Sequence, residues 1–282
     1  KDQAFVSSDR YATDQLLGIL ALALFDHKAA REAFKKLKGT RLYDKKRGQW
    51  RNFINEDQKL TDIGKFKLGA QDQLLGILAL ALFDHKAARN AFEKLKGSPF
   101  YDKKGGRWND LLSSSYGSGL TLSHGSTFKS RYVDSELLGV LVQALFDHKA
   151  ARDSFEKLQK TLLYDKERGQ WNRTLYQADE YRWIEDPARG AQPHLLGVLA
   201  LALFAPMAAR EAFEKLKESP LYDRERRQWN NRMGESQWPV DSDRYAGSQL
   251  LGVLVEAKLA YLFPKNPDVV EEGAPLPEVS RS

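Results

Sequence analysis

The chain has 282 residues, of which 42% are hydrophobic, so it can bury a sizeable core and disorder is not expected. It contains no cysteine, which excludes disulfides, thiolate metal sites and a cysteine nucleophile. Its formal charge of +6 arises from 44 basic and 38 acidic residues that are interleaved along the chain. This mixed pattern is typical of a solvated surface and disfavours a nucleic-acid partner.

The most apolar stretch, residues 16–25, is too short to span a bilayer, so no membrane span is predicted. The chain starts at Lys1 without a methionine and shows no signal-peptide pattern. We therefore expect a mature form or an excised fragment. The compartment is not determined by these features, and an extracellular one is only slightly favoured.

A long repeat organises the sequence. The string Leu-Leu-Gly-(Ile/Val)-Leu begins at Leu16, Leu74, Leu137, Leu195 and Leu250, in steps of 58, 63, 58 and 55 residues. Self-similarity at such a period indicates a repeat architecture. The units start near residues 9, 67, 130, 188 and 243, and the fifth stops after its first helix, near Phe263. Residues 1–263 are therefore predicted to form a single repeat domain.

Each unit is predicted to begin with a helix that is apolar on nearly every side, as in residues 15–25, and such a helix is buried all round. One glycine per copy interrupts it, at Gly18, Gly76, Gly139, Gly197 and Gly252. A glycine inside a helix costs about 1 kcal/mol relative to alanine. Its recurrence at one position indicates a close helix contact or a small opening onto a cavity.

The second predicted helix of each unit is amphipathic. In the first copy Ala30, Ala33, Phe34 and Leu37 follow the i, i+3, i+4, i+7 spacing of one helix face. The first helix of a unit is then an inner helix and the second an outer one. The predicted fold is all-α, with four and a half helical hairpins arranged in an α/α toroid or a curved solenoid, and no strand pattern is evident.

Two further features recur in each unit. A histidine stands between the helices in the first three copies (His27, His85 and His148), where a cap or turn role is favoured over metal ligation. After the second helix, Tyr-Asp, basic residues and a glycine have the composition of a turn, which ends at a tryptophan. These tryptophans are predicted to be packing anchors: Trp50, Trp108, Trp171 and Trp229.

The residues that lead into the inner helix alternate between two types. The first, third and fifth copies carry an Arg-Tyr pair: Arg10, Tyr11, Arg131, Tyr132, Arg244 and Tyr245. The second and fourth copies carry Gly-Ala-Gln instead, at residues 69–71 and 190–192. A structural cause, such as an arginine that caps a neighbouring loop, is one explanation. A pocket lined by alternate Arg-Tyr pairs is the other.

The segments between each tryptophan and the next inner helix differ in length and sequence, which is typical of a scaffold whose function lies in its loops. The last two of them mix carboxylates, which accept hydrogen bonds from hydroxyls, with aromatic side chains, on which sugar rings stack. The candidate ligand-binding residues of these loops are Asp179, Glu180, Tyr181, Trp183, Trp238, Asp241 and Asp243. The six Arg-Tyr residues are placed at the rim.

No catalytic residue is assigned, because near-identical units present the same groups many times whereas an active site needs different groups in different roles. Catalysis would have to use the divergent loops, where paired carboxylates suit glycoside hydrolysis. The sequence shows no nucleophile elbow and no phosphate-binding loop. No metal and no cofactor are expected.

The hairpin unit resembles a known architecture. An aromatic lead-in, an apolar inner helix, an outer helix with Ala-Ala-Arg-Glu-Ala-Phe and a Leu-Tyr-Asp…Gly-Gln-Trp turn are similar to the unit of α/α-toroid proteins, which include six-hairpin glycosidases and polysaccharide lyases. The resemblance covers residues 9–263. It implies a ring of inner and outer helices with a glycan cleft at the loop-rich end. Six hairpins need twelve helices and nine are predicted, so the ring is smaller, open or incomplete.

We therefore predict an α/α repeat binding module whose favoured ligand is a polysaccharide or oligosaccharide held at the loop-rich end. A glycoside hydrolase or polysaccharide lyase that uses loop carboxylates is the first alternative. A protein-interaction solenoid that grips a protein partner is the second. Residues 264–282 contain four prolines and are predicted to be a tail or linker.

Overall fold

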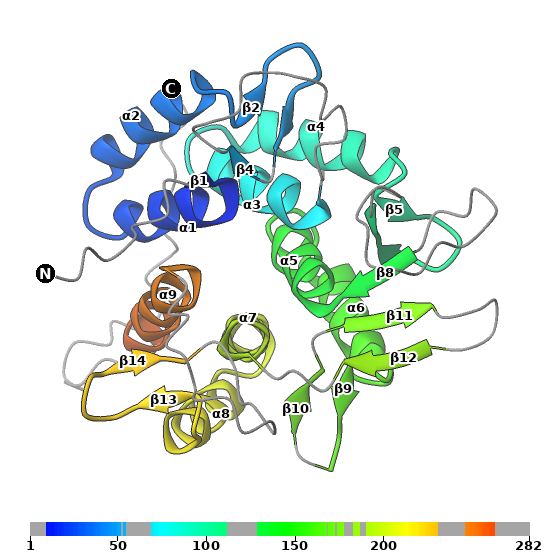
Figure 1. The fold of residues 1–282 in the computed structure, drawn as a ribbon, viewed down its shortest axis with the longest axis vertical. Helices are drawn as coiled ribbons and strands as arrows, with labels where there is room; N and C mark the ends of the chain where they lie inside the picture. The colour runs from blue at the N-terminus through cyan, green and yellow to red at the C-terminus, as the bar shows by residue number, and fades with distance from the viewer. Residues whose placement is uncertain are drawn as a thin grey trace, which may run out of the picture.

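The fold is that of a computed structural model of the chain (Figure 1). The structure describes residues 10–51, 53–54, 69–111, 129–167, 169–172, 174–177, 183–186, 190–230 and 246–262. Within these ranges it contains nine α-helices and fourteen short β-strands. None of the helices in these ranges is long and apolar enough to cross a membrane. The predicted tail, residues 264–282, lies outside the described residues.

Five apolar helices form an inner ring: α1 (Ala12–Ala23), α3 (Ala70–Ala81), α5 (Val133–Ala144), α7 (Ala191–Phe204) and α9 (Ala246–Leu262). Each inner helix contacts the next one, and α9 contacts α1, so the ring is closed (Figure 1). Closure makes the fold an α/α toroid rather than an open solenoid. The ring is smaller than that of six-hairpin proteins, because five inner helices complete it.

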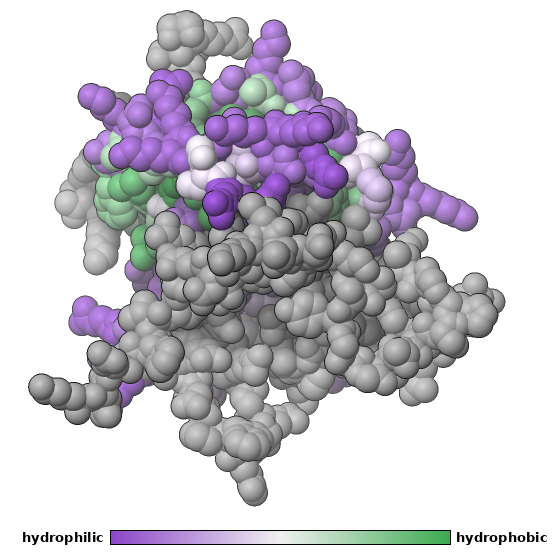
Figure 2. Space-filling view, turned by 45° about the horizontal axis from the view of Figure 1, so that its top comes forward, coloured by the Kyte–Doolittle hydropathy of each residue, from purple (hydrophilic) through white to green (hydrophobic). Residues whose placement is uncertain are grey.

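Four outer helices surround this ring: α2 (His27–Lys38), α4 (His85–Lys96), α6 (His148–Leu158) and α8 (Pro206–Glu218). Each packs on the inner helix of its own unit and buries one alanine, one phenylalanine and one leucine, which in α2 are Ala30, Phe34 and Leu37. The opposite face is polar, and hydrophilic side chains cover much of the described surface in Figure 2. The predicted division into inner and outer helices is confirmed.

Three of the four outer helices begin at an aspartate cap. The Asp26 carboxylate accepts the N–H of Ala29 at 2.8 Å, and Asp84 and Asp147 cap α4 and α6 in the same way. Such a cap satisfies a backbone donor that the helix itself leaves without a partner. The fourth unit has no acidic cap, and Pro206 occupies the first turn of α8 instead.

A β-hairpin with two residues in each strand follows each outer helix. The four hairpins are β2 (Tyr43–Asp44) with β3 (Gln49–Trp50), β5 (Tyr101–Asp102) with β6 (Arg107–Trp108), β9 (Tyr164–Asp165) with β10 (Gln170–Trp171), and β13 (Tyr222–Asp223) with β14 (Gln228–Trp229). These strands were not expected, because no strand pattern is evident in the sequence. The turn needs one residue with positive φ, which is Gly48 (φ 68°) in the first hairpin. In the fourth hairpin Arg227 adopts this conformation (φ 54°) without being a glycine.

The recurring tryptophans lie on the recurring glycines of the next unit. The four pairs are Trp50 on Gly76, Trp108 on Gly139, Trp171 on Gly197, and Trp229 on Gly252. A Cβ built at Gly76 would overlap the Trp50 indole and would lie only 2.9 Å from its Cε2 atom. The indoles are buried. The tryptophans are therefore packing anchors, as predicted, and each glycine is present because it makes room for one of them.

A glutamine holds the backbone of the tryptophan in place at two of these boundaries. Gln73 Oε1 accepts the N–H of Trp50 at 2.9 Å, and Gln73 Nε2 donates to the Trp50 carbonyl at 2.7 Å. Gln249 makes the same two bonds to Trp229. Trp50 and Trp229 therefore each join two consecutive units through both the ring and the backbone.

The histidines between the helices also join units, which differs from the predicted cap role. The Nε2–H of His27 donates to the carbonyl of Leu82 in the next unit at 3.0 Å, and the ring lies edge-on against Phe83. His85 and His148 make the equivalent contacts. The cap itself is the preceding aspartate. The fourth unit lacks the histidine, and α9 has Leu259 where the other inner helices have a phenylalanine.

The segments predicted to be loops contain further strands. A four-stranded sheet has the order β12 (Trp183–Asp186), β11 (Thr174–Gln177), β8 (Lys129–Tyr132) and β7 (Asp110–Leu111), with all neighbours antiparallel. It joins two different predicted loops, and β8 runs directly into α5. Similarly β1 (Arg10–Tyr11) runs into α1 and pairs with β4 (Phe53–Ile54). These strands therefore lie at the end of the ring where the inner helices begin.

The alternation of lead-in sequences corresponds to two ways of entering an inner helix. The Arg-Tyr copies that the structure describes enter from a strand, β1 before α1 and β8 before α5. The Gly-Ala-Gln copies enter from an extended glycine, Gly69 before α3 and Gly190 before α7. This difference provides a structural cause for the alternation in these four copies.

Candidate functional site

Polar residues gather in the first turns of the inner helices, in the three positions before each Leu-Leu-Gly. These positions hold Thr13-Asp14-Gln15, Gln71-Asp72-Gln73, Asp134-Ser135-Glu136, Gln192-Pro193-His194 and Gly247-Ser248-Gln249. At the third position, Gln73, His194 and Gln249 contact the backbone of a boundary tryptophan. We call the polar residues at the first two positions the collar, which comprises Thr13, Asp14, Gln71, Asp72, Asp134, Ser135, Gln192 and Ser248.

Contacts within the collar cross from one inner helix to the next. Thr13 Oγ1 donates to Asp72 Oδ1 at 2.7 Å and joins α1 to α3. Asp14 accepts the backbone N–H of Gly247 and so joins α1 to α9, where the ring closes. The residues Asp72, Asp134, Ser135 and Ser248 are buried. The collar thus collects polar groups from all five inner helices at one end of the ring.

Three carboxylates of the collar, those of Asp14, Asp72 and Asp134, belong to the first turns of α1, α3 and α5. The positive end of a helix dipole stabilises a carboxylate there. These three carboxylates, on three consecutive inner helices, provide several hydrogen-bond acceptors at the end of the ring where the inner helices begin. The buried Ser248 hydroxyl adds another polar group and has no hydrogen-bond partner among the described residues.

Burial raises the pKa of the Asp14 carboxyl above its ordinary value, and the hydrogen bond from the Gly247 amide partly offsets this increase. Carboxyl groups with a raised pKa occur at catalytic and binding sites more often than elsewhere. Asp14 is therefore a collar residue whose burial alters its acid–base chemistry.

The raised pKa predicts how stability depends on pH at Asp14. The folded protein binds this proton more tightly than the unfolded chain. The contribution of Asp14 to the free energy of unfolding is therefore greatest at low pH and falls as the pH rises through the folded pKa. At neutral pH the desolvated Asp14 carboxylate destabilises the folded protein relative to the unfolded chain, so Asp14→Asn is expected to raise Tm at pH 7 and to have little effect in strong acid. Thermal unfolding measured between pH 2.5 and about 8 tests this.

Asp44 provides a control of opposite sign. The backbone amide of Arg47, followed by the Arg51 side chain, lowers the pKa of the Asp44 carboxyl, although desolvation opposes them. Its stabilising contribution is therefore present above the ordinary carboxyl pKa and lost in acid, so Asp44→Asn should lower Tm at pH 7. A decrease in Tm for both variants at pH 7 would contradict the assignment for Asp14.

The structure places some of the predicted site residues and not others. Arg10 and Tyr11 form β1, Arg131 and Tyr132 end β8, and Trp183 begins β12, so Arg131, Tyr132 and Trp183 belong to one four-stranded sheet. Tyr11 is 40% exposed, and Tyr132 is half-buried. The others lie outside the described residues: Asp179, Glu180, Tyr181, Trp238, Asp241, Asp243, Arg244 and Tyr245. Their ligand-binding role remains a prediction.

The collar itself was not among the predicted site residues. Its signal in the sequence is a carboxylate two or three positions before Leu-Leu-Gly in three of the five copies, at Asp14, Asp72 and Asp134. A single acidic residue in the first turn of a helix is ordinary, because it interacts favourably with the helix dipole. Only the closed ring shows that the three first turns lie at the same end.

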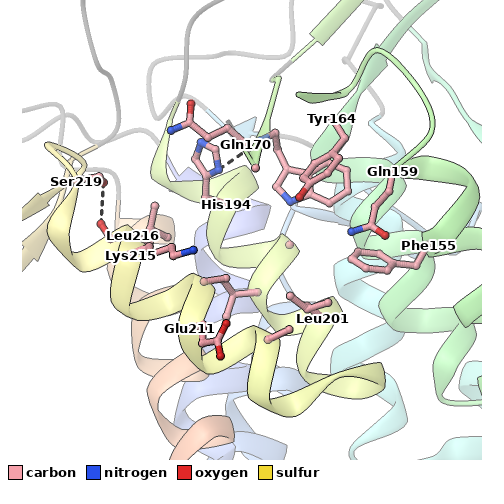
Figure 3. A pocket seen from close by; sticks show the side chains of 16 residues that line it. Phe155, Gln159, Tyr164, Gln170, His194, Leu201, Glu211, Lys215, Leu216 and Ser219 are labelled. Carbon is pink, nitrogen blue, oxygen red and sulfur yellow. Dashed lines mark hydrogen bonds between the residues drawn. The ribbon is translucent and has the colours of Figure 1, made fainter. Parts of the chain in front are cut away.

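Three similar grooves lie at the boundaries between consecutive units, with volumes of about 360, 200 and 310 Å³. Figure 3 shows the third, lined by Phe155 at α6, Tyr164 from the hairpin, His194 from α7 and Lys215 from α8. Each contains the tryptophan and the glycine of its boundary. Because the same groove recurs at three boundaries, we attribute it to the packing of the repeat and not to a particular ligand.

The donor set of the collar does not resemble a metal site. Within the described part of the chain, no group of three or more histidine, aspartate or glutamate side chains is arranged to hold a metal ion. The collar instead offers carboxylates, hydroxyls and amides that are spread around a ring, which is a set suited to hydrogen bonding.

A closed ring of helical hairpins, with polar residues at the start of its inner helices, defines an α/α toroid. The chain is similar to the endoglucanase Cel10, a family 8 glycosyl hydrolase from Klebsiella pneumoniae, with a TM-score of 0.56 and 15% identity over 90% of this chain and 92% of that one. For a family 8 endo-β-1,4-glucanase from an Achatina fulica gut metagenomic library, the TM-score is 0.55 at 14% identity, over 90% of each chain.

A cellobiose 2-epimerase from Bacillus thermoamylovorans is also similar, with a TM-score of 0.54 and 12% identity over 88% of this chain and 72% of that one. The sequence matches no protein-family profile and no curated protein. At these identities the likeness establishes the shared fold alone, and the resemblance to α/α-toroid proteins that the hairpin pattern indicated is confirmed.

Proposed function

We propose that this chain binds a polysaccharide or oligosaccharide at the end of the ring where the inner helices begin. The observation that carries the proposal is the collar, in which Asp14, Asp72 and Asp134 come from three consecutive inner helices. Sugar hydroxyls donate hydrogen bonds, and ionised carboxylates are their strongest acceptors among protein side chains. The short strands β1 and β8 stand beside this end and add tyrosines next to it.

The similar structures support the choice of ligand. Two of them are named as β-1,4-glucanase or endoglucanase and one as a cellobiose epimerase, so β-1,4-linked gluco-oligosaccharides are the first ligands to test. Isothermal titration with cello-, xylo- and manno-oligosaccharides should show saturable binding of at least one series. Absence of binding in all three series would contradict the proposal.

Matched variants connect binding to the collar. Asp14→Ala and Asp134→Ala should each weaken binding tenfold or more, because a hydrogen bond to a charged group contributes about 1.5–3 kcal/mol. Asp44→Ala removes a carboxylate of the β2–β3 hairpin that is not part of the collar, and should leave binding unchanged. Tm measurements on all three variants show whether each one remains folded under the conditions of the titration.

The predicted loop residues belong to the same proposal. Trp183 and Trp238 are proposed to stack on sugar rings, so replacing both with alanine should abolish binding and leave Tm nearly unchanged. A large decrease in Tm would instead identify them as core residues. The rim role proposed for Arg10, Tyr11, Arg131 and Tyr132 is tested by the corresponding alanine variants.

Glycoside hydrolysis is a second candidate, which the raised pKa of Asp14 favours. A glycosidase needs one carboxyl group with a raised pKa that can act as an acid, and burial moves the pKa of Asp14 in this direction. Incubation with a soluble β-1,4-glucan should then release new reducing ends, and Asp14→Asn should abolish the release. Binding without any release would leave the binding module as the function.

A further inference from the structure

One of the five boundaries between inner helices differs from the others. At four boundaries the hairpin of the preceding unit supplies a tryptophan, and three of these also have a histidine and a phenylalanine on the preceding outer helix that contact the next inner helix. The boundary between α9 and α1 has no preceding outer helix among the described residues. We call it the open boundary.

At the open boundary, no described residue occupies the position that a tryptophan indole occupies at the other four boundaries. A Cβ built at Gly18 meets nothing within 4 Å, whereas the equivalent position on each of the other inner helices would overlap an indole. Gln15, at the position of Gln73 and Gln249, is exposed, whereas those two glutamines hold the backbone of a tryptophan. Gly18 and Gln15 of α1 are therefore equivalent to the residues that contact a tryptophan at other boundaries, but no described tryptophan contacts them.

No outer helix among the described residues covers the same place. Phe25 is 79% exposed, although the equivalent phenylalanines Phe83, Phe146 and Phe204 pack against a preceding outer helix. Val253 of α9 is 39% exposed, whereas its four equivalents, Ile19, Ile77, Val140 and Val198, are at most 5% exposed. Figure 2 shows an apolar patch at its left, on the side where Figure 1 places α1 and α2.

We infer that the open boundary binds a segment of another polypeptide that consists of an amphipathic helix followed by a tryptophan-bearing turn. The four filled boundaries define the chemistry of this segment. The helix has three to four turns and an Ala-x₃-Phe-x₂-Leu stripe, and the tryptophan follows in a tight hairpin. Such a segment would cover Phe25 and Val253 and would place its indole on Gly18.

Charge complementarity also selects the partner helix. The last turn of α1 contains no basic residue, and its carbonyl groups form the negative end of the helix dipole. The equivalent carbonyl groups of Leu82, Leu145 and Leu203 accept a hydrogen bond from a histidine on the preceding outer helix. A histidine or arginine in the first turns of the partner helix would therefore complement the end of α1.

The sequence of residues 264–282 does not correspond to such a segment. Residues 264–282 contain four prolines and no tryptophan, so their sequence lacks both the outer-helix stripe and the anchor. In a second copy, each of the four tryptophan hairpins already lies on the next inner helix of its own chain. A partner with its own helix and tryptophan turn is therefore the occupant that the structure supports.

A peptide with the sequence of residues 26–51, which spans α2 and the β2–β3 hairpin, is the probe. Labelled at its N-terminus and titrated with the full chain, it should show saturable fluorescence anisotropy. Gly18→Ala should weaken binding at least tenfold without lowering Tm, because alanine favours the helix and only an incoming indole would meet its Cβ. A peptide carrying Trp50→Ala should not bind. Binding that Gly18→Ala does not change would overturn the proposal.

A second measurement addresses a peptide that is too disordered to bind on its own. Residues 26–51 appended after Ser282 act at a high effective concentration and should raise Tm, and Gly18→Ala should cancel the increase. Failure of both the peptide and the fusion to act would overturn the proposal. So would a peptide that binds only after residues 264–282 are removed, or a dimer in sedimentation that Gly18→Ala converts to monomer, because the occupant would then be the tail or a second copy.

Discussion

Gly139→Ala is expected to lower the free energy of unfolding by about 3 kcal/mol, at the upper end of the range for overpacked cores. A Cβ at this position would overlap the Trp108 indole and would lie 2.9 Å from its Cε2 atom. The indole cannot move away easily, because it is buried between Phe92 and Tyr101 and its ring centroid lies 4.8 Å from that of Tyr101. Denaturant unfolding followed by circular dichroism measures the change.

Gly18→Ala is the matched control for this prediction. The two glycines occupy the same position of the inner helix, but nothing that the structure describes lies within 4 Å of a Cβ at Gly18. Alanine favours a helix over glycine by about 1 kcal/mol, so this variant should be as stable as the parent or more stable. Equal destabilisation by both substitutions would show that the tryptophan is not the reason for the glycine.

Trp108→Ala is expected to lower the free energy of unfolding by about 4 kcal/mol, as truncation of a large buried aromatic side chain does. Trp108 is 5% exposed and packs between α4, its own hairpin and the first turns of α5. Its removal leaves a cavity at the boundary between the second and third units. The same denaturant measurement reports the loss, and a neutral result would contradict the anchor role and restore a ligand role for this tryptophan series.

The two substitutions should be strongly coupled. In the Trp108→Ala background the space above Gly139 is empty, so adding Gly139→Ala should cost little or stabilise slightly. The sum of the single effects would then exceed the effect of the double variant by about 3 kcal/mol, which a double-mutant cycle measures. Additive effects would place the indole and the glycine apart in solution.

The repeat, its division into inner and outer helices and the anchor role of the tryptophans could be predicted because each depends on local pattern. An apolar helix such as α1 and an amphipathic helix such as α2 differ in periodicity, which neighbouring residues define. The recurrence of Tyr-Asp and tryptophan located the turn, although not its strands. A two-residue strand leaves no alternation of side chains to recognise.

The contacts of the histidines and glycines could not be predicted from pattern. His27 bonds to Leu82, 55 residues away, and Trp50 lies on Gly76, so each residue acts on the next unit and not on its own. The sheet of β7, β8, β11 and β12 pairs segments from two loops of unrelated sequence. Such pairings depend on how the units are oriented, which no single unit determines.

The sequence by itself determined the repeat unit, the identity of its helices, the absence of thiol chemistry and the role of the tryptophans as packing anchors. Only the tertiary structure decided that five inner helices close the ring, that α9 meets α1, and that Asp14, Asp72 and Asp134 gather at one end. The physical reason is that closure depends on the rotation from each unit to the next. That rotation is determined by side-chain packing across the boundaries, and its sum over five inner helices is a property of the whole chain.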